Sequence, residues 1–173
     1  ASNNTGIGYN SLNSNTTGAN NTAVGASAGD ANTTADGMAA FGSGALGANT
    51  TGNYNSSFGS FSLSLNTTGT QNSAVGGFAL NKNTTASNNT AVGYLSLFEN
   101  TTGTENTAIG SLALDANTTG ESNTAVGYLA LSANTTGGNN VAIGRVSLDA
   151  NTTGNKNTAL GNGTLSASST GSF

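Results

Sequence analysis

The chain has 173 residues, of which 34% are hydrophobic and 6% charged, and its formal net charge is −4. Three basic residues are too few to hold a phosphate backbone, so we expect no nucleic-acid partner. The absence of Cys and His excludes disulfides, thiolate chemistry and imidazole catalysis, and removes the usual zinc ligands. We therefore expect no enzyme activity, no catalytic residue, no cofactor and no metal site.

One glycine recurs every 17 residues without an insertion, and we call it the marker glycine. The ten marker glycines are Gly8, Gly25, Gly42, Gly59, Gly76, Gly93, Gly110, Gly127, Gly144 and Gly161. A fixed short period predicts that each repeat is one unit stacked on the next. We therefore expect residues 1–173 to form a single repeat rod, a segment of a longer fibre. Positions are counted from the marker glycine, so position −1 precedes it.

The three residues before each marker glycine predict a short strand. Position −1 is large and apolar in every repeat, and position −2 is small, as in Thr124-Ala125-Val126. The marker glycine itself suits a bend or a close approach of two backbones.

A second short strand is expected just after the marker glycine. Leu129 and Leu131 flank Ala130, and a leucine recurs at position +4 in every repeat except at Gly29. This period of two is typical of a strand with one buried face. A helix is excluded because the interruptions every 17 residues leave no room for about ten helical residues and their caps.

An Asn-Thr-Thr-Gly sequence ends the first nine repeats and predicts a turn. Its glycine is expected to supply a positive φ, with Ala35 and Ala86 in its place in two repeats. Its asparagines form the predicted surface ladder Asn15, Asn32, Asn49, Asn66, Asn83, Asn100, Asn117, Asn134 and Asn151. Three interpretations stay open for this set: turn chemistry with amide stacking from coil to coil, N-glycosylation of the Asn-Thr-Thr sequons, and an ice-binding threonine array.

The sequence thus predicts an all-β fold, a parallel β-solenoid of about ten 17-residue coils with two short strands each. Coils stacked ~4.8 Å apart would make a rod of roughly 50 Å. About three large apolar side chains per coil make a thin core. We therefore expect lateral association, most simply a trimer that shares an apolar axis.

The aromatic residues fall into two groups. Tyr94 and Tyr128 follow marker glycines at a position where Ser and Arg also occur, so they are expected to face solvent. Phe41, Phe58, Phe61 and Phe78 are expected to pack in the core.

The segments 140–144 (Asn-Val-Ala-Ile-Gly), 106–110 and 123–127 resemble the head repeats of trimeric autotransporter adhesins. The longer pattern also resembles repeats of bacterial surface proteins and phage tail fibres. The resemblance implies a left-handed parallel β-roll in which three chains pack side by side and position −1 faces inward. The 17-residue coil is longer than the head repeats of that family, so a single-chain rod stays an alternative.

We therefore expect a non-enzymatic, adhesive or structural segment of an extracellular, cell-surface or virion fibre. It would associate with itself, contact a host surface or glycan, and insert no segment into a membrane. Two alternatives remain: a subunit of an end-to-end filament, and an ice-binding solenoid.

Overall fold

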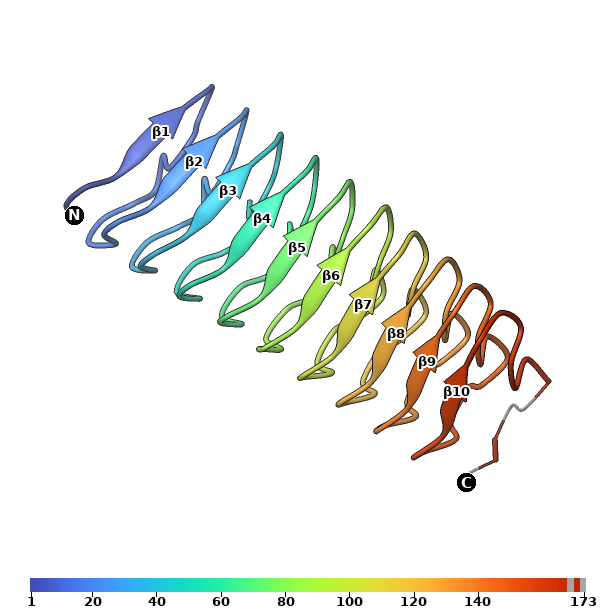
Figure 1. The fold of residues 1–173 in the computed structure, drawn as a ribbon. Helices are drawn as coiled ribbons and strands as arrows, with labels where there is room; N and C mark the ends of the chain where they lie inside the picture. Colours follow the sequence, from blue (N-terminus) through green and yellow to red (C-terminus); the bar gives the residue numbers. More distant parts are fainter. Residues whose placement is uncertain (168–169, 172–173) are drawn as a thin grey trace.

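The computed structural model describes residues 1–167 and 170–171, and it is a parallel β-solenoid (Figure 1). Its coils stack along one axis from the N-terminus to the C-terminus, and the described residues contain no helix. Each strand has three residues: β1 (Thr5–Ile7), β2 (Thr22–Val24), β3 (Ala39–Phe41), β4 (Ser56–Phe58), β5 (Ser73–Val75), β6 (Thr90–Val92), β7 (Thr107–Ile109), β8 (Thr124–Val126), β9 (Val141–Ile143) and β10 (Thr158–Leu160). The predicted fold class is confirmed.

The ten strands form one parallel sheet in the order of the sequence. Each residue pairs with the residue 17 positions later, as in Ala91 with Ala108 and Val92 with Ile109. The repeat length therefore sets the register, and equivalent side chains lie in columns along the rod. In Figure 1 the arrows lie side by side as a single row.

The described residues form one strand per coil, so the second predicted strand is wrong. Ala130 and Leu131 are adjacent in sequence, and both are completely buried. Leu129 and Leu131 both have a φ of 55°, a left-handed conformation that strand residues do not adopt. The segment from position +1 to +6 is instead a series of turns.

Left-handed residues at positions +2 and +4 produce this turn segment. The nine leucines at position +4 have φ between 51° and 55°, although Leu in this region costs about 1–2 kcal/mol. Hydrogen bonds in both directions along the rod offset that cost. Leu95 N donates to Gly77 O of the preceding coil at 3.2 Å, and Leu97 N donates to Ala113 O of the next coil at 2.9 Å.

The marker glycines lie where the backbones of neighbouring coils pass close to one another. Gly93 has a φ of 135°, a conformation that side chains disfavour. A Cβ atom built on it would stand 2.6 Å from both C and O of Gly110. The marker glycine therefore meets two requirements at once, the backbone angle and the short distance between coils.

The glycine of Asn-Thr-Thr-Gly does not supply a positive φ, contrary to our expectation. The left-handed residue lies two positions later, at Asn20, Asn88 or Glu105, for example. The turn glycine is instead favoured by space, since a Cβ on Gly52 would contact Gly69 O of the next coil. At Ala86 the chain accommodates such a methyl group, and the Thr84 N to Thr101 O distance there is 3.2 Å.

The apolar core is a column of alanines beside a column of leucines. Positions −2 and +4 supply most of it, as in Ala108 and Leu114, which are completely buried. Gly29 interrupts the leucine column, and Met38 fills the space. A Cβ on Gly29 would collide with the Met38 methyl group, and Met38 is 1% exposed. In this coil Met38 therefore fills the part of the core that the position +4 leucine fills in the other coils.

Candidate functional site

The asparagines of the Asn-Thr-Thr-Gly turns point into the rod. Asn32 and every later member of this ladder through Asn151 are completely buried, and Asn15 is partly buried. The expectation of a surface ladder is therefore wrong. A buried amide whose NH2 group is hydrogen-bonded offers no attachment point for a glycan in the folded rod.

The expected amide stacking is present. From Asn66 to Asn151, each Nδ2 donates to Oδ1 of the asparagine one coil earlier, over 2.7 to 3.1 Å. The same Nδ2 also donates to the carbonyl three residues later in its own turn. The ladder thus links neighbouring coils and closes each turn. Buried polar groups stabilise a fold only when they are paired in this way.

A second asparagine ladder, at position −4, was not anticipated. Its side chains accept a hydrogen bond from the backbone N of the next coil, as Asn106 Oδ1 does from Asn123 N at 3.0 Å. They donate to the turn carbonyl of that coil, as Asn106 Nδ2 does to Gly120 O at 2.8 Å. The sequence signal was an asparagine at position −4 in nine of ten repeats, with Met38 as the exception.

Position −1 faces outward, so the expectation that it lies in the core is wrong. We call this column the apolar ridge: Ile7, Val24, Phe41, Phe58, Val75, Val92, Ile109, Val126, Ile143 and Leu160. Val92 is 36% exposed and Ile109 is 41% exposed. Position −2 faces inward because consecutive strand residues point to opposite faces, and the space between the sheet and the leucine column admits only a small side chain, such as Ala or Ser57.

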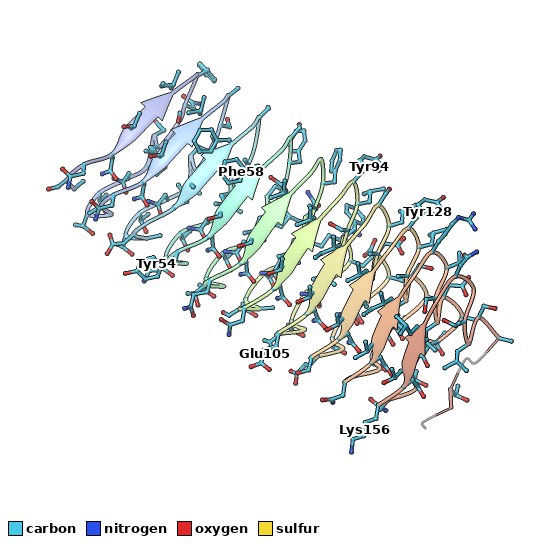
Figure 2. All side chains as sticks on the ribbon, in the orientation of Figure 1. Tyr54, Phe58, Tyr94, Glu105, Tyr128 and Lys156 are labelled. Atoms are coloured by element: carbon cyan, nitrogen blue, oxygen red, sulfur yellow. The ribbon has the colours of Figure 1, made fainter. Side chains whose placement is uncertain are left out.

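Aromatic rings extend the apolar ridge at the marker-glycine corner, where Figure 2 labels Phe58, Tyr94 and Tyr128. Phe41 and Phe58 stack with their centroids 4.9 Å apart, and Phe61 and Phe78 stack at 5.5 Å. Three of these four phenylalanines, at positions 58, 61 and 78, are 36% to 44% exposed, so they are not core residues. Tyr94 and Tyr128 are exposed as predicted.

The two threonines of each turn differ in their surroundings. The first, at position +8, is half-buried from Thr33 to Thr152. From Thr16 to Thr135 its hydroxyl donates to the equivalent carbonyl of the next coil. Thr67 Oγ1 to Thr84 O at 3.0 Å and Thr118 Oγ1 to Thr135 O at 3.0 Å are examples. The second, at position +9, is exposed. Along these coils a single threonine column therefore reaches fully into solvent.

The rod has few charged side chains. Lys82 Nζ and Glu99 Oε2 lie 2.8 Å apart, and the same ammonium lies 5.0 Å from the centroid of Phe98. Burial raises the pKa of Asp115, and the charge of Glu99 raises it further, although backbone hydrogen bonds of Asp115 and Ala116 lower it. Asp115 Oδ1 is also buried without a hydrogen-bond partner among the described residues.

Replacing Asp115 with asparagine should stabilise the rod at neutral pH. Because the folded pKa is raised, the native state of the wild type loses stability as pH rises from the ordinary Asp value of 3.8 through the higher folded value. Asn81, at the equivalent position, donates to Phe61 O at 2.8 Å, and the new amide at position 115 would reach Leu95 O likewise. Denaturation midpoints across this pH range measure the effect.

Glu121→Gln, at an exposed carboxylate, is the control for that substitution. The pH-dependent loss should persist in Glu121→Gln and diminish in Asp115→Asn. A wild-type rod that gains stability as pH rises through the same range would contradict the assigned cause.

The chain matches no family model, and comparisons with curated proteins and with solved structures found no match. Among residues 1–167 and 170–171 there is no helix of sufficient length and hydrophobicity to cross a bilayer. The same residues contain no group of three or more acidic side chains placed to hold a metal ion. The repeated surface of the rod is therefore the feature from which its function is inferred.

Proposed function

We propose that this chain is a rigid, non-enzymatic segment of an extracellular, cell-surface or virion fibre, in which rods associate side by side through the apolar ridge. The observation that carries the proposal is the outward position of the ridge in every coil. Val75, Ile109 and Ile143 are 38% to 42% exposed on a regular sheet. The resemblance to adhesin head repeats supports the extracellular location and a three-chain arrangement.

Covering the whole apolar ridge yields a free energy comparable with the cost of association. Burying a Val, Ile or Phe side chain completely is worth about 1.5–3 kcal/mol, so covering the exposed two-fifths is worth ~0.6–1.2 kcal/mol per coil. Ten coils then supply ~6–12 kcal/mol, against a cost of association of about 4–15 kcal/mol. Association therefore depends on the number of coils in register, and long rods bind each other more tightly than short ones.

A regular rod also suits contact with a host surface or glycan, because many weak contacts combine when they are fixed on one support. The end-to-end filament remains an alternative, and electron micrographs would distinguish long single filaments from short bundles. The ice-binding alternative is weaker, because the hydroxyl of the first threonine is already bonded between coils. Of the two turn threonines in residues 33–136, only the second has a hydroxyl that makes no bond between coils.

Sedimentation of the purified chain tests lateral association. The wild type should sediment at micromolar concentration with the mass of three chains. Val92→Thr, Ile109→Thr and Val126→Thr together should shift it to the mass of one chain, because they make the ridge polar while keeping β-branched side chains in the strands.

Thr102→Val, Thr119→Val and Thr136→Val together form the matched control, since they exchange the same residue types on an exposed column in the same part of the rod. This variant should keep the mass of three chains. A wild-type chain that stays monomeric, or a ridge variant that associates as the wild type does, would count against the proposal.

A further inference from the structure

The threonine column at position +9 is an exposed surface that neither the fold nor the proposed association explains. Its members are Thr17, Thr34, Thr51, Thr68, Thr85, Thr102, Thr119, Thr136, Thr153 and Thr170, and all ten are exposed. The column is threonine in every repeat. It lies nine residues after one marker glycine and eight before the next, away from the apolar ridge in sequence.

Other exposed positions vary from coil to coil. Position −5 holds Asn, Gly, Tyr, Gln, Glu, Ser and Lys, and Figure 2 labels Tyr54, Glu105 and Lys156 along that edge. Position +1 holds Tyr, Ala, Ser, Gly, Arg and Asn. Exposure alone therefore does not fix a residue type in this rod, and the constancy of the threonine column needs a separate cause.

Hydrogen bonding within the rod does not supply that cause. The hydroxyls at position +8 donate across coils, whereas those from Thr17 to Thr136 at position +9 have no such bond among the described residues. The tenth repeat shows that the threonine at position +9 occurs without the bonded threonine at position +8. Its sequence has Ser168 and Ser169 in place of the Asn and the first Thr, yet it retains Thr170.

The spacing of the column argues for a neutral group on these hydroxyls. Two phosphates ~4.8 Å apart on neighbouring coils, each with a charge near −2, would repel by ~3 kcal/mol even at the dielectric constant of water. A chain of ten such groups would add this repulsion to a net charge that is already −4. A sugar adds bulk and hydroxyls without charge.

We propose that the threonine column is a site of O-linked glycosylation. The Thr Oγ1 attacks the anomeric carbon of a nucleotide-activated sugar, and the bond from that carbon to the nucleoside diphosphate breaks. The diphosphate leaves with the electron pair, and a base of the transferring enzyme takes the hydroxyl proton. The buried asparagines of the same turns stay unmodified, so the Asn-Thr-Thr pattern carries its sugar on the second threonine. This inference does not depend on the proposed association.

Intact-mass measurement of the protein isolated from the organism that encodes it tests the inference. The native mass should exceed the mass of the polypeptide by whole sugar units, at most one site per coil. Fragmentation that preserves side-chain linkages should place these units at position +9. A native protein at the mass of the bare polypeptide, sugars on other residues, or phosphate increments would overturn the proposal.

Two variants expressed in that organism sharpen the test. Thr68→Val removes one exposed hydroxyl and should lower the maximum number of sugars by one. Thr67→Val removes the neighbouring hydroxyl, which donates to Thr84 O at 3.0 Å, and should leave that maximum unchanged. Circular dichroism of both variants verifies the fold, and the mass of the native protein decides the question even if Thr67→Val fails to fold.

Discussion

Gly93→Ala should destabilise the rod by about 3–5 kcal/mol, the largest effect we expect from one methyl group. The φ of 135° by itself costs a side chain about 1–3 kcal/mol. The new Cβ would also stand 2.6 Å from C and O of Gly110, which are backbone atoms held by the sheet. Neither coil can move away without lengthening hydrogen bonds such as Gly110 N to Val92 O at 2.7 Å. Chemical denaturation at one fixed protein concentration measures the loss.

Gly77→Ala is the matched control for that prediction. Gly77 lies one position after a marker glycine, where Ala26 stands in another coil. A Cβ on Gly77 would meet the Tyr94 ring at 3.6 Å, an ordinary contact distance. We expect no loss of stability from Gly77→Ala. Equal denaturation midpoints for the two alanine variants would refute the steric role assigned to the marker glycines.

Asn117→Leu should cost about 2–6 kcal/mol, although leucine is similar in size and more hydrophobic. Asn117 Nδ2 donates to Asn100 Oδ1 and to Gly120 O, each at 3.0 Å, and Asn117 Oδ1 accepts from Asn134 at 2.8 Å. The substitution leaves an acceptor on Asn100 and a donor on Asn134 unpaired in the interior. Each unpaired buried group costs about 1–3 kcal/mol. The shift of the thermal or chemical unfolding midpoint reports this loss.

Asn139→Gly provides the comparison for an asparagine outside the ladders. Asn139 is exposed with a φ of 59°, and Gly37 occupies the equivalent position in another coil. Its replacement by glycine should leave the midpoint nearly unchanged. If Asn117→Leu were as stable as this control, the amide ladder would be dispensable and the leucine and alanine columns would suffice to hold the coils.

The period of the marker glycines was enough to predict the parallel solenoid and its register, because only stacked coils return the same residue to the same edge. The Leu97 column was also correctly placed inside. The second strand was wrong because residue pattern does not reveal φ, and left-handed Leu95 and Leu97 are rare in other folds. Alternation of large and small residues then looks like a strand although the backbone is a series of turns.

The candidate surface was predicted less well than the fold, and the reason is the size of the interior. We assigned large apolar residues to the core and asparagines to the surface, as in most proteins. In a coil this small the sheet lies so close to the leucine column that Ala108 fits inside and Ile109 does not. Asn117 is accommodated inside because coils stacked in register supply partners for its amide.

The exchange between Gly29 and Met38 limits how such a rod could change length during evolution. Copying or deleting 17 residues elsewhere joins two equivalent half-coils and keeps one large side chain, leucine or methionine, in the core of each coil. A crossover between Gly29 and Met38 would instead create one coil with neither large side chain and another with both. The first product has a hole in its core and the second is overfilled. Recombination that adds or removes coils is therefore tolerated along the rest of the rod, and this one coil is inherited whole.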